Sequence, residues 1–337
     1  MTPFIIPIFL PQMGCSYRCL YCHQEKITRR PGTLLDRDAF IHLVEKGLSS
    51  PKKEDREVEI AFFGGTFTNL PEDVQKLLLD WTEPYLAQNQ ITSLRLSTRP
   101  EALSPERIER LWDLGVRTIE LGVQSLNDTV LERSRRGHTA QEAIQAIKLL
   151  KTYPLTIGVQ LMTGLPGDCP ETFIETVNQV IRLKPHLIRI YPTLVLKNTA
   201  LAQWWTEGRY SPLSLHDSVT LCAQALELFE EAGIKVIRMG LQEHEGLRLE
   251  KDLVAGPHHP AFGSLVRGEW FLRKLLRDLN TQKPLHSPVV LRLAPREGDY
   301  LLGNRRRNLT RLTTLLGMSE IRIQIDPQAP PGRGHTP

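Results

Sequence analysis

The chain has 337 residues, of which 41% are hydrophobic and 24% charged, and its net charge is +4. This length suits a barrel-sized core with an appendage, and so small a net charge does not by itself indicate a nucleic-acid-binding protein. The sequence has no run of eighteen apolar residues and no signal peptide, so we expect a cytoplasmic protein without a membrane span.

Apolar, β-rich runs alternate with amphipathic stretches over the first 240 residues. The expected strands are Phe4–Leu10, Val58–Phe63, Ser93–Ser97, Thr118–Gly122, Thr156–Leu161, Leu187–Tyr191 and Val236–Met239. The expected helices are Asp36–Gly47, Pro71–Ala87, Pro105–Leu114, Ala140–Lys151, Pro170–Leu183 and Ser214–Ala232. Buried strands that alternate with helices form parallel sheets, and this number of units predicts an α/β fold with a full or partial (β/α) barrel.

The regular alternation weakens after residue 245. We therefore expect a barrel core over residues 1–245, a small C-terminal extension over residues 246–325 and a disordered, proline- and glycine-rich tail over residues 326–337. The extension contains a helical stretch at Trp270–Leu279. Two short strands between residues 288 and 326 flank an expected basic helix, Arg305–Leu316.

Three of the five cysteines lie within eight residues. Cys15, Cys19 and Cys22 form a C-x3-C-x2-C triplet just after the first strand, where a barrel places its active-site loops. A tight triplet without a secretory signal indicates a reducing compartment and a metal site. Structural zinc needs a fourth ligand, and His23 is poorly placed to complete the same shell as its neighbour Cys22. A four-iron cluster with one open iron fits better; a zinc knuckle or a chance triplet is the alternative.

Glycine and polar residues also follow the ends of the later strands. They are Gly64, Gly65 and Thr66 after the second strand, Ser97 on the third, Gln124 after the fourth, Arg136 before the next helix, and Gln160 and Gly164 on and after the fifth. Because the carboxyl ends of barrel strands meet at one face, we expect these residues to line one binding site.

The cysteine triplet and these strand-end segments together resemble the radical S-adenosylmethionine (SAM) superfamily over residues 4–245. The segments Ser97–Pro100, Leu121–Ser125 and Arg135–His138 are similar to the subgroup that contains the Elongator catalytic subunit and the oxygen-independent coproporphyrinogen oxidases. The resemblance implies a [4Fe–4S] cluster on the three cysteines, SAM as cofactor and a flavodoxin- or ferredoxin-type electron donor. Reductive cleavage of SAM would give a 5′-deoxyadenosyl radical that abstracts hydrogen from a substrate.

The resemblance also implies roles for single residues. Arg136 would pair with the SAM carboxylate, for which a guanidinium fork is suited. Gly64, Gly65 and Thr66 would hold the methionine amino group, although the family more often has Glu where Thr66 stands. Ser97 and Gln124 would face the ribose, Gln160 would lie near the ribose or adenine, and Gly164 would begin the wall against the adenine ring.

The substrate is less well defined by the sequence. Coproporphyrinogen oxidases carry Tyr-x-His before the cysteines, where this chain has Phe9 and Pro11. About ninety residues follow the barrel, too few for an acetyltransferase domain, so we expect a stand-alone bacterial protein of the Elongator-like type. We predict a tRNA substrate, with phosphate contacts from Arg305, Arg306 and Arg307; a solvated face explains these arginines equally well.

Two alternative functions and the role of one segment remain open at this point. A radical enzyme acting on a small molecule would have the same motifs. An iron–sulfur sensor or cluster carrier on a barrel scaffold needs only the cysteines, and neither Arg136 nor the Gly64-Gly65 pair. The segment Gly256–Phe262, which contains His258 and His259, either contacts substrate or forms a packed turn that closes the barrel mouth.

Overall fold

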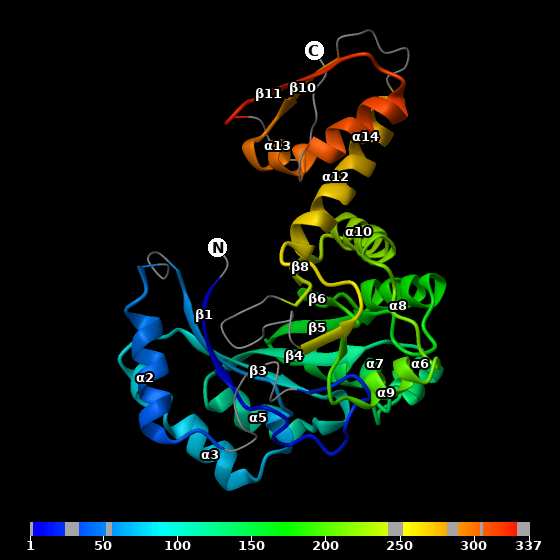
Figure 1. The fold of residues 1–337 in the computed structure, drawn as a ribbon. Helices are drawn as coiled ribbons and strands as arrows, with labels where there is room; N and C mark the ends of the chain where they lie inside the picture. Colours follow the sequence, from blue (N-terminus) through cyan, green and yellow to red (C-terminus); the bar gives the residue numbers. More distant parts are fainter. Residues whose placement is uncertain are drawn as a thin grey trace.

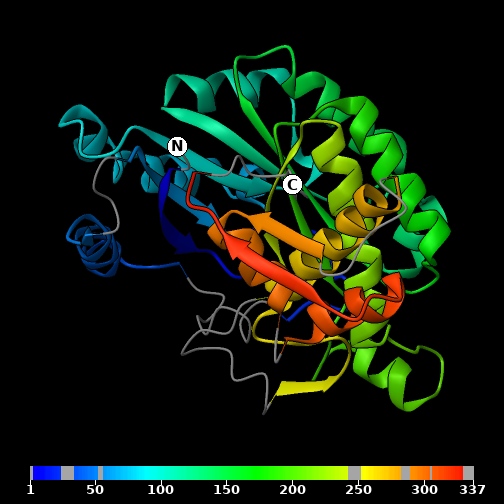
Figure 2. The same cartoon turned by 90° about the horizontal axis from the view of Figure 1, so that it is seen from above.

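The computed structural model describes residues 3–23, 34–51, 56–241, 252–281, 289–303 and 306–328. Seven parallel strands form one curled sheet in the order β1–β2–β3–β4–β5–β6–β8 (Figures 1 and 2). Their bounds are β1 Phe4–Phe9, β2 Val58–Phe63, β3 Ser93–Thr98, β4 Val116–Gln124, β5 Thr156–Thr163, β6 Leu187–Pro192 and β8 Lys235–Met239. Among the described residues β1 and β8 do not pair, so the predicted (β/α) barrel is a partial one.

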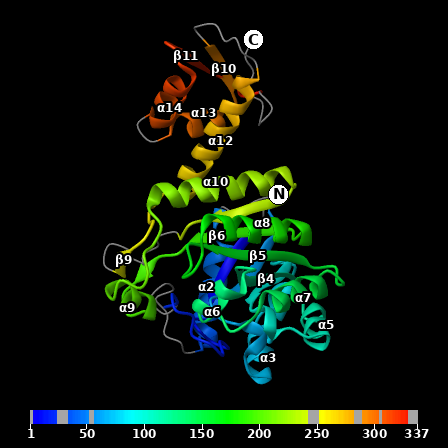
Figure 3. The same cartoon turned by 90° about the vertical axis from the view of Figure 1, so that its right-hand side faces the viewer.

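The main helices cover the outer, convex face of this sheet (Figures 1 and 3). They are α2 Arg37–Leu48, α3 Glu72–Asp80, α4 Glu83–Ala87, α5 Pro105–Asp113, α7 Ala140–Leu150, α8 Pro170–Leu183 and α10 Leu215–Glu231. Side chains such as Leu94, Leu96 and Ile119 are fully buried in the core between sheet and helices. Because side chains alternate across a strand, the polar residues between them face the inside of the half-barrel.

The structure corrects one predicted helix and adds two short ones. The stretch Pro71–Ala87 is not continuous: α3 ends at Asp80 and α4 begins at Glu83. Pro84 lacks a backbone N–H, so it cannot continue the hydrogen bonds of the preceding helix and lies instead in the first turn of α4. The helices α6 (Asp128–Arg133) and α9 (Ala200–Thr206), which the sequence analysis missed, lie near the carboxyl ends of the strands.

The segment that contains His258 and His259 forms a turn in which both histidines are partly exposed. It follows β9 (Leu253–Ala255), which pairs antiparallel with β7 (Val195–Leu196). Within the turn, His259 Nδ1 accepts a hydrogen bond from the backbone N–H of Ala261 at 3.0 Å. The turn leads into α12 (Phe262–Asn280), which contains the predicted stretch Trp270–Leu279.

The helix α12 connects the half-barrel to a second, smaller core (Figure 1). This core contains β10 Val289–Leu293, α13 Pro295–Leu302, α14 Arg307–Leu316 and β11 Ile321–Ile325. The expected basic helix exists as α14, with its start at Arg307 instead of Arg305, and the structure adds a second helix, α13, between the two strands. Arg305 and the predicted tail beyond residue 328 lie outside the described residues. None of the described helices is both long and apolar enough to cross a bilayer.

Candidate functional site

The cysteine triplet lies in the loop that follows β1. Cys15 and Cys22 are half-buried, whereas Cys19 is only 8% exposed. Two backbone hydrogen bonds shape the loop: Cys15 N donates to Gln12 O at 3.2 Å and Cys22 N donates to Cys19 O at 3.1 Å. The loop is also fastened to the chain before Arg136, because Leu20 N donates to Ser134 O at 3.0 Å.

The three cysteines are not arranged to hold a single metal ion. Over the described part of the chain, no group of three His, Cys, Asp or Glu side chains converges closely enough for that. A four-iron cluster binds each thiolate to a different iron, so its ligands lie farther apart than those of one ion. The sulfur-only donor set of the triplet fits such a cluster.

The other two cysteines lie away from the triplet. Cys169 is exposed at the start of α8, and Cys222 is buried in the core on α10. Burial raises the pKa of the Cys222 thiol to about 12, so it remains protonated at neutral pH. A buried neutral thiol behaves as a small apolar side chain.

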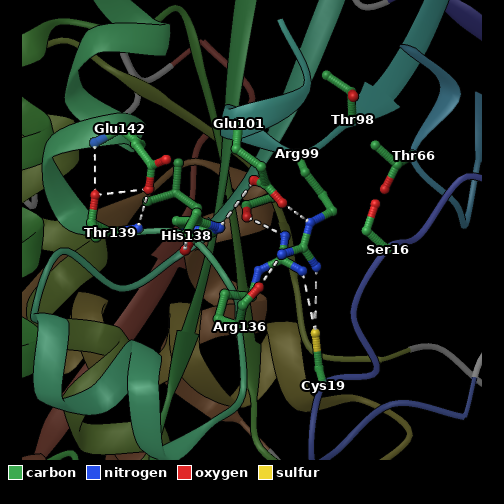
Figure 4. A network of polar contacts seen from close by, with 12 residues as sticks. Ser16, Cys19, Thr66, Thr98, Arg99, Glu101, Arg136, His138, Thr139 and Glu142 are labelled. Atoms are coloured by element: carbon green, nitrogen blue, oxygen red, sulfur yellow. Dashed lines mark hydrogen bonds and ion pairs between the residues drawn. The ribbon is translucent and has the colours of Figure 1, made fainter. Parts of the chain in front are cut away.

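Two arginines converge on Cys19 (Figure 4). Arg136 Nη1 lies 3.3 Å and Arg99 Nη1 lies 3.9 Å from Cys19 Sγ, and both arginines are buried. Burial alone would raise the pKa of the Cys19 thiol, but the two guanidinium charges outweigh it and the pKa is lowered. The thiolate, which is the form that binds iron, is therefore favoured at this position.

Hydrogen bonds hold Arg136 in place but do not use all of its N–H groups. Its Nη2 donates to Gly122 O at the end of β4, and its backbone carbonyl accepts a hydrogen bond from Arg99 Nη2. Its Nε is buried and has no hydrogen-bond partner among the described residues. A buried guanidinium N–H without a partner is costly, and an anionic group such as a carboxylate is the natural acceptor.

Arg99 is anchored by an acid and a histidine that the sequence analysis did not assign. Arg99 Nε donates to Glu101, and Glu101 Oε2 lies 3.4 Å from His138 Nδ1, a close polar contact (Figure 4). Burial opposes the ionisation of Glu101, but His138 and Arg99 lower its pKa to about 2. Burial also lowers the pKa of His138, so this ring is neutral near pH 7.

The segment Gly64 to Thr66 packs directly against the cysteine loop. Thr66 N donates to Met13 O at 2.8 Å, and Thr66 Oγ1 lies 3.3 Å from Cys15 Sγ. A Cβ atom on Gly65 would lie 2.2 Å from Met13 O, so only glycine permits this approach. The glycine backbone therefore lies directly against the backbone of the cysteine loop.

Gln124 and Gln160 come together inside the half-barrel. Gln160 Nε2 donates to Gln124 Oε1 at 3.1 Å, and Gln124 adopts a positive φ of 71° at the end of β4. Ser97 lies in register with Glu120 on the neighbouring strand, which places it on the inner face of the sheet, half-exposed. These three predicted residues therefore share the inner face of the sheet with one another.

Gly164 lies farther out, beside a cavity of about 450 Å³ between the β5–α8 loop and α9. Its φ is 71°, its N–H donates to Asp168 at 3.0 Å and its carbonyl accepts a hydrogen bond from Tyr210 Oη at 2.6 Å. The cavity is also lined by Trp204 and Arg209. Both backbone polar groups of Gly164, its N–H and its carbonyl, are therefore held by hydrogen bonds.

A ladder of buried charges crosses the inner face of the sheet, and the sequence analysis missed it. Arg95 lies 2.7 Å from both Glu59 on β2 and Glu120 on β4, and Arg189 Nη2 on β6 donates to Glu120 at 2.8 Å. Two cations and two anions balance, which compensates for the cost of burying them. The signal was the alternation of charged and apolar residues within β3, β4 and β6.

Comparisons with known proteins identify the family. A family model described as the radical SAM superfamily matches residues 9–180, just over half of the chain, and a model described as the Radical_SAM C-terminal domain matches residues 185–270.

Several curated proteins are similar in sequence. The tRNA uridine(34) acetyltransferase of Dehalococcoides mccartyi is 38% identical over 129 residues, 37% of this chain and 28% of that protein. Elongator complex protein 3 of Mus musculus is 28% identical over 192 residues, 51% of this chain and 35% of that protein. The match thus spans about a third or less of the length of these relatives.

A solved structure shares the fold. The archaeal Methanocaldococcus infernus Elp3 with an N-terminal deletion superimposes with a TM-score of 0.60 at 21% identity, covering 83% of this chain and 64% of that chain. Both the matched families and this fold agree with the parallel half-barrel and its cysteine loop. The chain therefore belongs to the radical SAM superfamily, a family of enzymes that use a [4Fe–4S] cluster and S-adenosylmethionine.

Proposed function

We propose that this protein cleaves SAM reductively at a [4Fe–4S] cluster on Cys15, Cys19 and Cys22 and modifies a tRNA. When bound, the cluster supplies one electron to the SAM sulfonium, which yields the 5′-deoxyadenosyl radical for hydrogen abstraction. The observation that carries the proposal is the convergence of Arg136 and Arg99 on Cys19, with Arg136 Nε left without a partner. A flavodoxin or ferredoxin is the electron donor we propose.

The residues of this chain provide the binding groups for the cofactor. Arg136 binds the SAM carboxylate, because its buried Nε needs an acceptor. Gly64, Gly65 and Thr66 place the cysteine loop and offer backbone carbonyls to the amino group. Ser97, Gln124 and Gln160 supply hydroxyl and amide groups for the ribose on the inner face, and Gly164 begins the adenine wall.

The proposal of a tRNA substrate is supported by the relatives. Both the bacterial and the archaeal sequences at 30–38% identity carry the name tRNA uridine(34) acetyltransferase. The similarity covers 26–28% of their length, so the reaction of this chain is proposed at the level of a radical modification of tRNA.

Two assays test the function. Anaerobically reconstituted protein with dithionite should form 5′-deoxyadenosine from SAM, and addition of tRNA should increase the rate. In parallel, nucleosides of total tRNA from a strain that lacks the gene should be compared with the parent by mass spectrometry. We expect one modified nucleoside to disappear from the mutant strain.

The two assays separate the parts of the proposal. A reducible cluster that never yields 5′-deoxyadenosine would contradict the radical reaction. Identical tRNA nucleosides in both strains, together with a rate that tRNA leaves unchanged, would contradict the tRNA substrate and leave the radical reaction standing.

A further inference from the structure

The C-terminal unit, which we define as residues 289–328, has an excess of positive charge. It contains seven arginines and four acidic residues: Arg292, Arg296, Arg305, Arg306, Arg307, Arg311 and Arg322 against Glu297, Asp299, Glu320 and Asp326. This excess of three charges accounts for most of the net charge of +4 of the whole chain. The unit stands apart from the half-barrel and is joined to it by α12 (Figure 3).

The arginines of this unit are of two kinds. Arg311 lies 2.5 Å from Glu269 on α12, and Arg322 lies 2.8 Å from Glu320, so both are neutralised. Arg306 and Arg307, in contrast, are exposed at the beginning of α14, and neither forms an ion pair within the described ranges. Their charges are therefore available to an external anion.

Gly303 and Arg306, the described residues next to α13 and α14, both have a positive φ, and a hydrogen bond joins the two helices. Gly303 ends α13 with φ 58° and ψ −171°, a conformation that essentially only glycine adopts, and Arg306 has a left-handed φ of 60°. Asn308 Nδ2 donates to Tyr300 O at 3.0 Å and thereby fastens the start of α14 to α13. The first turn of α14, where the two arginines lie, is therefore held against α13.

The two helices α13 and α14 follow one another between two paired strands, and the sequence between the helices is Gly-Asn-Arg-Arg. β10 and β11 are parallel neighbours, and the connection between them runs through two helices, α13 and α14, with a four-residue link from Gly303 to Arg306. In KH domains a Gly-X-X-Gly loop between two helices clamps the backbone of about four nucleotides. Here the first glycine is present, and Arg306 takes the left-handed conformation that the last glycine would favour.

An apolar edge lies beside α13. Ile325 on β11 is 45% exposed, and a Cβ on Gly298 of α13 would lie only 2.4 Å from Ile325 Cδ1. The absence of a side chain at Gly298 thus lets β11 approach α13 closely. The bases of single-stranded RNA are unstacked and can contact a neighbouring surface while basic residues hold the phosphates.

We propose that the C-terminal unit is a KH-like module that binds single-stranded RNA, with Arg306 and Arg307 at the phosphates and the α13–β11 edge at the bases. The proposal deepens the proposed function, because it rests on an RNA substrate and assigns the recognition of that RNA to a part of the chain remote from the cysteines. Arg306 and Arg307 are exposed and form no ion pair in the part of the chain that the structure describes, and their charge complements a phosphate backbone, which favours this partner.

Fluorescence anisotropy with the full-length protein tests this module. The probes are a single-stranded oligoribonucleotide of about eight nucleotides, its DNA counterpart and its RNA duplex, each titrated at two salt concentrations. Arg306→Gln/Arg307→Gln should weaken RNA binding by about tenfold or more and make the dependence of log K on log salt shallower by about 1.4, which is two phosphates at 0.7 each. Far-UV circular dichroism should show an unchanged fold, because both side chains are exposed.

The matched control is Arg292→Gln/Arg322→Gln. It removes the same number of charges from the same unit, at two exposed positions on its strands, and should retain RNA binding within about threefold. Equal binding by the wild type and the Arg306/Arg307 variant, or equal losses in both double variants, would overturn the proposal. So would the absence of wild-type binding, or binding of the DNA or duplex probe as tight as that of the RNA strand.

The outcome is independent of the reaction. The Arg306/Arg307 variant should form 5′-deoxyadenosine without tRNA at the wild-type rate, because both residues lie far from the cysteines in the fold (Figure 1). If RNA binding is confirmed but tRNA nucleosides are unchanged in the deletion strain, the tRNA substrate fails and the RNA module stands. If the nucleosides change but the double variant binds RNA normally, the module fails and the tRNA reaction stands.

Discussion

The half-barrel and the C-terminal unit use the same side chain in opposite ways. In the half-barrel Arg99 and Arg136 are buried, 3% and 7% exposed, and their charges lower the pKa of Cys19. In the C-terminal unit Arg306 and Arg307 are exposed and lack an ion-pair partner in the described structure. Water and salt screen the exposed pair, whereas the buried pair acts in a medium of low dielectric constant. Burial, more than residue type, therefore decides whether an arginine tunes one sulfur or attracts a polyanion.

The largest effect should come from the cysteines and should be confined to the half-barrel. Cys15→Ala, Cys19→Ala and Cys22→Ala should each abolish the cluster, because each removes one of its three thiolate ligands. Iron and sulfide content and visible absorption after anaerobic reconstitution measure this. RNA affinity of the same variants should remain that of the wild type.

The two remaining cysteines are the controls for this prediction. Cys169→Ala and Cys222→Ala should retain the cluster, since one side chain is exposed and the other is buried among apolar residues. Loss of the cluster in either of these variants would show that the ligand assignment is wrong.

A smaller effect is expected from Arg136. Arg136→Gln should weaken SAM binding by about 10- to 100-fold while the cluster remains, which is the range for a hydrogen bond to a charged group. Equilibrium dialysis of SAM against the reconstituted protein measures it. Because the site is buried, moderate salt should change this affinity far less than it changes RNA binding.

Arg110→Gln is the control for Arg136, since Arg110 is partly exposed on α5 and bonds Gln75 and Glu72. It should leave SAM binding unchanged. Normal SAM affinity of the Arg136→Gln variant would show that Arg136 does not bind SAM. The lack of a hydrogen-bond partner for its Nε among the described residues would then have no explanation.

The smallest effect concerns pH and the anchor of Arg99. The folded-state pKa of Glu101 is about 2, below its ordinary 4.5, so the acid stabilises the fold above about pH 4.5 and this contribution is lost as pH falls from 4.5 towards 2. Glu101→Gln should lower the free energy of unfolding by about 1–2 kcal/mol at pH 7, a value already reduced for partial exposure.

Urea denaturation of the apo-protein at a series of pH values measures this contribution. The difference between Glu101→Gln and the wild type should shrink as the pH drops below about 4.5. Glu132→Gln, at an exposed acid on α6, should show no such pH-dependent difference. A difference that stays constant down to pH 3 would rule out ionisation of Glu101 as its cause.

Much of the half-barrel was predictable because its signals are local. Every expected strand from Phe4 to Met239 exists, with ends that differ by at most a few residues, since buried parallel strands are continuous apolar runs bounded by turns and caps. The break between α3 and α4 was missed although Pro84 marks it. In the C-terminal unit the apolar periods are short, so α13 was overlooked, whereas α14 was expected to within two residues.

The sequence by itself determined the cysteine triplet, the order of strands and helices, and the residues at the strand ends. Only the tertiary structure decided which of these residues meet, because Cys19 and Arg136 are 117 positions apart and no local pattern encodes a contact of that range. The pairing of Glu101 with Arg99 and His138, and the charge ladder from Glu59 to Arg189, likewise depend on the register of neighbouring strands. The tertiary structure likewise decided which arginines of the C-terminal unit are paired. Arg311 reaches Glu269 on α12, whereas Arg306 and Arg307 have no ion-pair partner in the described structure, because packing determines which carboxylate lies within reach of each arginine.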